Sequence, residues 1–186
     1  MSKVDTTTNL DFTALLTAKP NAPQAPALPK KLPEEIIIGA KALKKGGYFV
    51  NITNPRPKRI PGLTSPTILI VEDEPDTLLL IGHVLAKEGY RTRKAATGAA
   101  FVTAIKQAPI PDLILLDLEL PDVSGVVILT KLRAHPGTKA IPIVVLSARS
   151  EPKDVYQCMS LGADGYISKP TNAAILVQAV KAVLGG

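Results

Sequence analysis

Short apolar runs alternate with segments of helical periodicity five times between residues 66 and 186. Runs of four or five apolar residues are too short for a helix and are typical of strands buried on both faces of a sheet. We therefore expect strands at Thr67–Val71, Tyr90–Ala95, Leu113–Leu116, Ile141–Leu146 and Gly165–Ile167. The intervening segments predict helices at Pro75–Lys87, Thr97–Gln107, Ser124–Ala134, Pro152–Leu161 and Asn172–Val183, with Thr97, Ser150 and Thr171 as N-caps.

This alternation predicts an α/β fold. A strand that is followed by a helix and then by another strand favours a parallel sheet, with right-handed crossovers that place helices on both faces. The strand at Tyr90–Ala95 is the least apolar and carries three basic residues. Charged side chains protect an exposed sheet edge from pairing with other chains, so we expect this strand at an edge.

Polar residues follow four of the predicted strands. Glu72 and Asp73 follow the first strand, Asp117 ends the third, Ser147 the fourth and Lys169 the fifth. The carboxyl ends of parallel strands lie at one edge of a sheet, where ligands bind in open α/β folds. We therefore expect three carboxylates, a hydroxyl and an ammonium group to converge there.

The residues at these strand ends resemble the receiver domain of bacterial response regulators. The resemblance covers residues 66–186 and rests on four segments, Val71-Glu72-Asp73-Glu74, residues 117–125, Leu146-Ser147-Ala148 and residues 162–170. Each segment alone is weakly specific, but the four in this order and spacing are highly specific. The resemblance implies a doubly wound, five-stranded parallel sheet of the flavodoxin or CheY-like (βα)5 type, with the strand order 2-1-3-4-5.

The resemblance also implies a phosphoacceptor. Asp117 would be the nucleophile that receives a phosphoryl group. Clustered carboxylates repel one another, and oxygen ligands favour Mg²⁺. Asp73 and Asp117 would coordinate this ion, Glu72 would act directly or through water, and the family adds the backbone carbonyl of Glu119.

Two further residues, Lys169 and Ser147, are expected to contact the phosphoryl group. Ser147 stands where many members of the family have Thr. In the family this pairing pulls the loop after the fourth strand inward, and Tyr166 matches the aromatic switch position that turns inward with it. The switched surface would be the fourth helix, fifth strand and fifth helix of the domain, at residues 152–183. The bond between Lys169 and Pro170 resembles the cis peptide of the family.

We therefore expect a phosphorylation-controlled switch that accepts its phosphoryl group from a histidine kinase or phosphotransfer protein. The chain stops at Gly186, soon after the fifth helix, so we expect no C-terminal output domain. The signal would pass to a downstream protein through the switched surface, through residues 33–60, or through both. We do not expect an enzyme in the usual sense, because catalysis would be limited to phosphorylation and dephosphorylation of the protein itself.

The first 65 residues divide into two predicted parts. Residues 1–32 are rich in Pro, Ala and Thr and predict a flexible tail. Residues 33–65 predict a basic docking segment and linker, with a helix of about three turns from Pro33 and a short strand at Tyr48–Thr53. The helix would show Ile36, Ala40 and Leu43 on one face. This segment is too small to fold alone, so it should dock on the main domain, on another subunit or on a partner.

The excess positive charge lies in this N-terminal third. Residues 1–65 contain 10 Lys/Arg against 4 Asp/Glu, while residues 66–186 contain 12 of each. Phosphates of nucleic acid or an acidic protein could contact its basic cluster. A solvated charged face or a protein partner is favoured, because few aromatic residues are available for stacking. The cluster comprises Lys41, Lys44, Lys45, Arg56, Lys58 and Arg59.

Two alternatives to the switch stay open. The first is an adaptor or assembly subunit that docks through the receiver fold and the N-terminal extension, largely independently of phosphorylation. The second is binding of nucleic acid by the basic extension. Binding that is unchanged by Asp117→Asn would favour the adaptor, whereas a steep loss of polynucleotide affinity with salt would favour nucleic acid.

The lengths of the apolar runs and the character of the N-terminus indicate where in the cell the chain is expected. No apolar run approaches the roughly 18 residues needed to cross a bilayer, and the N-terminus lacks the apolar segment of a signal peptide. We therefore expect a cytoplasmic protein without membrane insertion. Cys158 is the single cysteine, which excludes an internal disulfide and predicts a small packed side chain.

Overall fold

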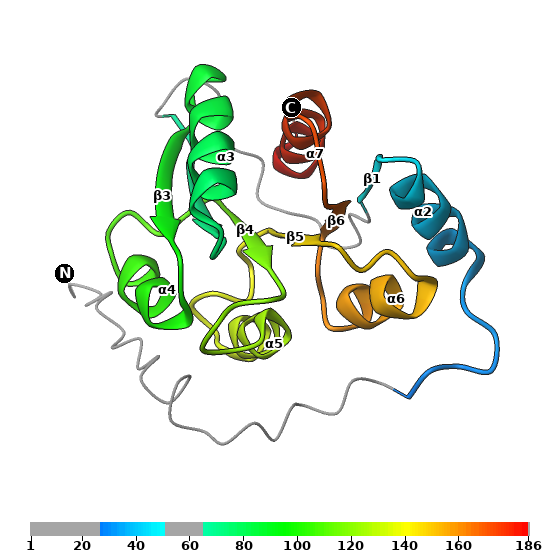
Figure 1. Ribbon diagram of the computed structural model, residues 1–186. Helices are drawn as coiled ribbons and strands as arrows, with labels where there is room; N and C mark the ends of the chain where they lie inside the picture. Colours follow the sequence, from blue (N-terminus) through cyan, green and yellow to red (C-terminus); the bar gives the residue numbers. More distant parts are fainter. Residues whose placement is uncertain (1–26, 51–64, 186) are drawn as a thin grey trace.

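We describe the protein from a computed structural model, in which residues 27–50 and 65–185 are described. A central sheet runs through the molecule with helices on both of its faces (Figure 1). Its strands are β1 (Tyr48–Val50), β2 (Thr67–Val71), β3 (Arg91–Ala95), β4 (Leu113–Asp117), β5 (Ile143–Ser147) and β6 (Gly165–Ser168). They lie in the order β1-β6-β5-β4-β2-β3, and only β1 runs antiparallel to its neighbour within the described residues.

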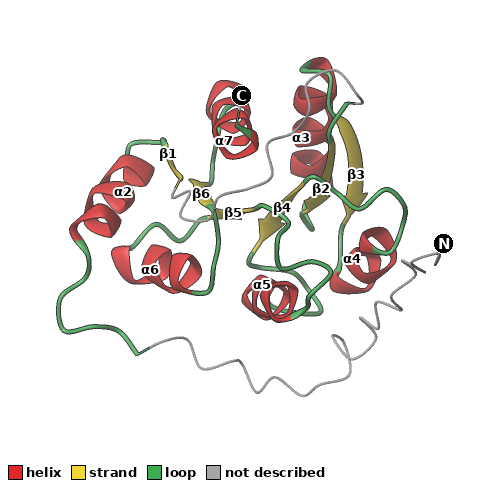
Figure 2. Ribbon diagram, turned by 180° about the vertical axis from the view of Figure 1, so that it is seen from behind, coloured by secondary structure: helices red, strands yellow, loops and turns green. Residues whose placement is uncertain are grey.

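The helices form the two outer layers. On one face of the sheet lie α3 (Pro75–Lys87) and α7 (Ala173–Leu184), and on the other lie α4 (Gly98–Ile105), α5 (Gly125–Ala134) and α6 (Pro152–Ser160). The N-terminal helix α2 (Glu34–Lys44) lies beside α6 and extends the second layer (Figure 1, Figure 2). The sheet therefore separates two hydrophobic cores.

The central strands supply both cores because successive side chains of a strand point to opposite faces. In β2, Leu69 and Val71 belong to the core under α4, α5 and α6, whereas Ile68 and Ile70 belong to the core under α3 and α7. All residues of β2, β4, β5 and β6 are buried. Burial on both faces explains why these strands read as continuous apolar runs.

The charged strand β3 is at one edge of the sheet, as predicted. The Arg93 guanidinium donates hydrogen bonds to the carbonyl oxygens of Ala104 at 2.7 Å, Gln107 at 3.0 Å and Pro109 at 3.2 Å. These carbonyls follow or end α4, where a helix leaves its last acceptors without partners. The edge strand thus anchors the end of the neighbouring helix as well as blocking further strand pairing.

The α/β fold class and the order 2-1-3-4-5 of the five parallel strands are confirmed, as β3-β2-β4-β5-β6. The sheet differs from the five-stranded prediction by one strand. Residues Tyr48–Val50 pair antiparallel with β6, so the sheet has six strands and is not wholly parallel. The unpaired backbone groups at the outer edge of β6 provide the physical reason, because an exposed edge readily accepts another strand.

Of the three predicted N-caps, only Thr97 is correct. Its side-chain oxygen accepts a hydrogen bond from the backbone N–H three residues later, at 3.0 Å. The predictions of Ser150 and Thr171 are wrong by one residue, because the N-caps of α6 and α7 are Glu151 and Asn172. Asn172 caps through its side chain, whereas Glu151 precedes a proline at the first helical position, which has no N–H to satisfy.

The predicted N-terminal helix forms, with Ile36, Ala40 and Leu43 buried along one face. Several predictions fall outside the described residues: those for residues 1–26, for residues 51–64 including the end of the strand at Tyr48–Thr53, and for the basic residues Arg56, Lys58 and Arg59. In the described part of the chain, no helix combines the length and apolar character needed to cross a membrane.

Candidate functional site

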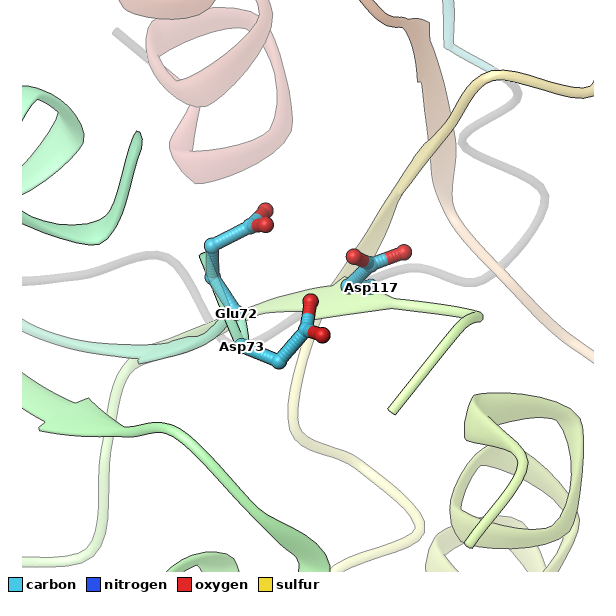
Figure 3. Close-up of side chains that lie close together, drawn as sticks. All are labelled: Glu72, Asp73 and Asp117. Atoms are coloured by element: carbon cyan, nitrogen blue, oxygen red, sulfur yellow. The ribbon is translucent and has the colours of Figure 1, made fainter. Parts of the chain in front are cut away.

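The candidate site lies at the carboxyl ends of β2 and β4. Glu72 and Asp73 directly follow β2, and Asp117 is the last residue of β4. One carboxylate oxygen from each of the three lies within 4.8 Å of the others. Figure 3 shows the three side chains reaching from the two neighbouring strands towards a common space. The sheet therefore brings together the acids that the strand pattern predicted to converge.

Lys169 joins this cluster from the end of β6. Its ammonium nitrogen Nζ lies 2.7 Å from Asp117 Oδ2, and 2.8 Å and 2.6 Å from the Oε1 and Oε2 atoms of Glu72. The backbone places it there, because the Lys169 N–H donates to the carbonyl oxygen of Ser147 at 2.9 Å and continues the pairing of β6 with β5. Lys169 thus bridges the buried acid of the first parallel strand and the predicted phosphoacceptor.

Burial and charge oppose each other in this cluster. Glu72 is 0 % exposed and Asp117 3 % exposed. Burial raises the pKa of Glu72 above its ordinary value, and the charge of Asp117 acts in the same direction, although the hydrogen bond and charge of Lys169 lower it. Burial also acts to lower the pKa of Lys169, but its hydrogen bonds to Asp117 and Glu72 outweigh this effect and raise that pKa overall.

The loop after β4 positions the predicted phosphoacceptor. The Glu119 N–H donates to Asp117 Oδ1 at 3.0 Å, and the Gly125 N–H donates to the carbonyl oxygen of Leu118 at 2.9 Å. A Cβ atom at position 125 would lie 2.1 Å from the carbonyl oxygen of Asp117, closer than any real contact. Glycine is therefore required where α5 begins, because the helix start lies directly against the phosphoacceptor strand.

Ser147 and Tyr166 lie on the adjacent strands β5 and β6. The buried Ser147 Oγ accepts a hydrogen bond from the Arg149 N–H at 3.1 Å. The Tyr166 ring is fully buried, and its hydroxyl donates to the Arg149 carbonyl oxygen at 2.5 Å. Both predicted switch residues therefore hold the same short loop through Arg149.

Arg149 is the residue of the site that the sequence reasoning missed. Its guanidinium contacts Glu119 Oε1 at 2.9 Å through both Nε and Nη2, across the loops that follow β4 and β5. Both side chains are more than half exposed, so the ion pair itself adds little stability. The available signal was its position two residues after Ser147, which mirrors Glu119 two residues after Asp117.

The donor set fits a hard divalent cation. All three side chains of the cluster offer carboxylate oxygens, which are the ligands that Mg²⁺ prefers. Three ionised carboxylates and one ammonium leave a formal charge of −2, and only Asp73 is exposed. Glu72, Asp73 and Asp117 would hold the ion, whereas the backbone carbonyl of Glu119 as a further ligand stays a prediction.

The Lys169–Pro170 peptide bond is cis, in agreement with the resemblance, and a second cis bond joins Ala108 to Pro109. Cys158 is buried in the core, as its isolation in the sequence predicted. Burial raises the pKa of its thiol to about 12, so the thiol stays protonated near neutral pH.

Curated relatives share this domain. The chain is 41 % identical over 103 residues to the transcriptional regulatory protein KdpE of Mycobacterium tuberculosis. The matched segment covers 55 % of this chain and 44 % of that protein. It is 38 % identical over 117 residues to the phosphate regulon transcriptional regulatory protein PhoB of Escherichia coli, covering 63 % of this chain and 51 % of PhoB. The chain thus spans about half the length of these relatives.

Two solved structures match the fold over their full length. A response regulator from Chloroflexus aurantiacus has a TM-score of 0.62 and 32 % identity, with coverage of 66 % of this chain and 100 % of that one. The receiver domain of the sensor histidine kinase PA1611 from Pseudomonas aeruginosa has a TM-score of 0.59 and 29 % identity, with the same coverage. That structure has a magnesium ion coordinated in the active site cleft.

The family model of the response regulator receiver domain matches residues 68–181, which is more than half of the chain. This match begins at β2 and ends within α7, so it includes every strand that contributes to the acidic cluster. Sequence, fold and the convergence of Lys169 on the acids agree, and the chain belongs to the response regulator receiver domain family.

Proposed function

We propose that this chain is a phosphorylation-controlled switch in which Asp117 accepts a phosphoryl group from a histidine kinase or phosphotransfer protein. The observation that carries the proposal is the contact of Lys169 Nζ with Asp117 at 2.7 Å, beside two further acids that can hold a cation. Receiver domains interact with donors of this kind, so the family supports the same assignment. The proposal puts the chain in the cytoplasm, where such donors carry their phosphohistidine.

The chemistry requires positioning and charge stabilisation. A carboxylate oxygen of Asp117 forms a bond to phosphorus, while the bond from phosphorus to the donor's imidazole nitrogen breaks and the nitrogen leaves with the electron pair. Lys169 stabilises the negative charge on the phosphoryl oxygens. A bound Mg²⁺ would supply Lewis-acid stabilisation of the same oxygens. Attack of water on the acyl phosphate later returns the free carboxylate and inorganic phosphate, and in this sense the protein acts only on itself.

The switch would follow from the hydroxyl and the loop. Ser147 Oγ now accepts a hydrogen bond from the backbone N–H of Arg149. In the phosphorylated state this hydroxyl would donate its own proton to a phosphoryl oxygen, and turning towards that oxygen would draw the loop inwards together with Arg149. Tyr166 would sense the change because its hydroxyl donates to the Arg149 carbonyl. The altered surface would signal to a downstream protein.

The test is the mass of the intact protein after incubation with acetyl phosphate and Mg²⁺. We expect an adduct of about 80 Da, equivalent to one phosphoryl group, in the wild type. Asp117→Asn should show none. The matched control is Asp76→Asn, because Asp76 is an exposed acid in the first turn of α3, close in sequence to the cluster. Failure of the wild type to form the adduct, or an adduct on Asp117→Asn, would refute the proposal.

A pull-down separates the switch from an adaptor. Wild type and Asp117→Asn would each be used as bait, with and without acetyl phosphate and Mg²⁺. A partner that binds the wild type only with the phosphoryl donor supports the switch. A partner that binds all four samples equally identifies an adaptor, for which the receiver fold is a docking platform.

A further inference from the structure

The segment formed by α2 and β1 covers the face that the family resemblance predicts to be the switched surface. Strand β1 pairs antiparallel with β6, with Tyr48 opposite Ile167, Phe49 opposite Tyr166 and Val50 opposite Gly165. Helix α2 packs beside α6, and β1 also contacts α7 (Figure 1). Residues 34–50 precede the receiver domain in the chain. They therefore contact α6, β6 and α7 from outside that domain.

Apolar contacts hold this segment in the receiver core. Ile36, Ala40 and Leu43 are each less than 5 % exposed and belong to the same core as Tyr166. Phe49 packs against α2, where a Cβ atom at Gly39 would lie 2.4 Å from the ring. The segment is thus an integral layer of the fold, and its burial favours the docked position.

Two polar contacts join the segment to parts of the receiver that adjoin the active site. The buried Ser168 Oγ donates to the Leu43 carbonyl oxygen at 2.8 Å, at the last turn of α2. Lys44 Nζ lies 2.8 Å from Glu151 Oε1 and holds the pKa of that carboxyl below its ordinary value. Ser168 is the last residue of β6 and directly precedes Lys169, and Glu151 lies in the loop after Ser147. Lys169 and Ser147 are the residues that the phosphoryl group would engage.

The spacing along the chain makes this connection short. Ser168 directly precedes Lys169, whose ammonium contacts Asp117. Glu151 is two residues after Arg149, which binds both Ser147 and Tyr166. A movement of Lys169, or of the loop after Ser147, therefore acts on a residue that binds α2, without any intervening helix or strand.

We propose that residues 34–50 are an internal ligand of the α6–β6–α7 face and that phosphorylation of Asp117 weakens their docking. This inference rests on the proposed function. A phosphoryl group adds negative charge and three acceptor oxygens beside Lys169 and Ser147. Drawing these two residues towards it displaces Ser168 from Leu43 and Glu151 from Lys44, because Ser168 directly precedes Lys169 and Glu151 is four residues after Ser147. The same docking keeps the outer edge of β6 from pairing with any other strand while β1 is in place.

The coupling is reciprocal. If phosphorylation weakens docking by some factor, docking opposes the phosphorylated state by the same factor. Phosphorylation would then have a specific consequence for partners. The face that becomes free is β6 with its edge unpaired, together with the apolar positions now filled by Ile36, Ala40 and Leu43. The downstream protein would compete for this face with the chain's own N-terminal segment.

Amide hydrogen exchange of the full chain tests the coupling. Beryllofluoride with Mg²⁺ serves as a stable mimic of the phosphoryl group, and acetyl phosphate with Mg²⁺ serves as the covalent donor. We expect peptides from residues 34–50 to exchange at least about fivefold faster in the treated wild type, the lower end of typical allosteric coupling. Peptides from α3 should be unchanged, and Asp117→Asn should show no response in either segment.

The outcomes are distinguishable. Unchanged or slower exchange of residues 34–50, in protein whose mass shows the phosphoryl adduct, overturns this inference and leaves the proposed function intact. Absence of the adduct overturns the proposed function and this inference with it. Faster exchange in both the wild type and Asp117→Asn also overturns the coupling, because the reagent would then act elsewhere.

A matched pair of variants tests the contact itself. Ser168→Ala removes the hydrogen bond to Leu43 and should speed exchange of residues 34–50 in the untreated protein, by up to the roughly tenfold that a buried hydrogen bond contributes. Thr138→Ala removes an equivalent buried hydroxyl bond, to the Leu132 carbonyl at 2.9 Å, which lies away from α2 and β1. Thr138→Ala should leave residues 34–50 unchanged. Equal effects of the two variants on this segment would contradict the proposal.

Discussion

Replacing Lys169 with methionine tests the electrostatics of the site. The substitution keeps an unbranched chain but removes the ammonium that contacts Asp117 and Glu72. Glu72 is fully buried, and the Asp117 side chain is 5 % exposed, so both carboxylates would lose their nearest positive charge in a place that water hardly reaches. Breaking a buried ion pair by removing one partner costs about 3 to 5 kcal/mol.

We expect a loss near the lower end of this range. The Lys169 side chain is 24 % exposed, so solvent already weakens its interactions. A loss of about 3 kcal/mol in the free energy of unfolding corresponds to a fall in Tm of roughly 10 °C for a domain of this size. The control is Lys106→Met, because Lys106 is exposed at the end of α4 and its replacement should cost less than about 1 kcal/mol.

The pH dependence identifies the cause. The pKa of Glu72 is already raised by burial, and removing Lys169 removes an interaction that lowers it, so the pKa rises further. A carboxyl group whose folded pKa exceeds its unfolded value destabilises the fold above the folded pKa, and this effect disappears as the pH falls below the ordinary value of 4.5. The difference in the free energy of unfolding between wild type and Lys169→Met should therefore be largest near neutral pH and shrink towards pH 4.5. The raised pKa of Lys169 plays no part in this window, because that group stays charged throughout.

The assay is urea unfolding followed by circular dichroism, at neutral and acidic pH, with and without Mg²⁺. Millimolar Mg²⁺ should restore more stability to Lys169→Met than to the wild type, because a cation bound only by the folded state replaces the missing charge. The reasoning would be refuted if Lys169→Met lowered the free energy of unfolding by less than about 1 kcal/mol. It would also be refuted if this loss were equal at both pH values and unchanged by Mg²⁺.

Three further predictions concern packing. Gly125→Ala should destabilise the fold by about 1 to 3 kcal/mol in urea unfolding and reduce formation of the phosphoryl adduct, because its Cβ meets the Asp117 carbonyl oxygen; unchanged phosphorylation would contradict this. Leu43→Ala should cost about 2 to 5 kcal/mol if α2 unfolds together with the receiver, and a smaller loss with rapid amide exchange confined to residues 34–50 would show that the segment detaches first. Cys158, with its pKa raised to about 12, should resist a thiol reagent at neutral pH in the folded protein and react fully in denaturant; rapid reaction of the folded protein would contradict its burial.

Local patterns in the sequence were enough to predict a parallel α/β sheet, and the resemblance of four segments to receiver domains supplied its strand order. The apolar runs at Leu113–Leu116 and elsewhere are buried on both faces, and such strands must be parallel and covered by helices. Parallel strands end at one edge, so the convergence of Asp117 with Glu72, Asp73 and Lys169 followed from their positions alone. The geometry agrees with these expectations, whereas the catalytic and metal-binding roles of the residues stay predictions.

The tertiary structure decided what distant segments do to one another. The pattern at Ile36, Ala40 and Leu43 predicts an apolar face, but many surfaces could cover such a face, and only the fold shows that it belongs to the core beside Tyr166. The hydrogen bond from Ser168 to Leu43 joins residues 125 positions apart, for which no local pattern exists.

Arg149 illustrates the same limit within the site. Its backbone binds Ser147 and Tyr166, and its side chain binds Glu119. Its position two residues after Ser147 was the signal in the sequence, but this position does not show which residues it contacts. Periodicity records which side of an element is apolar, because burial of that side is a local requirement. Which element that apolar side packs against depends on the sheet edges and faces that the completed fold leaves open. No local pattern records these edges and faces, because they arise only when the whole chain has folded.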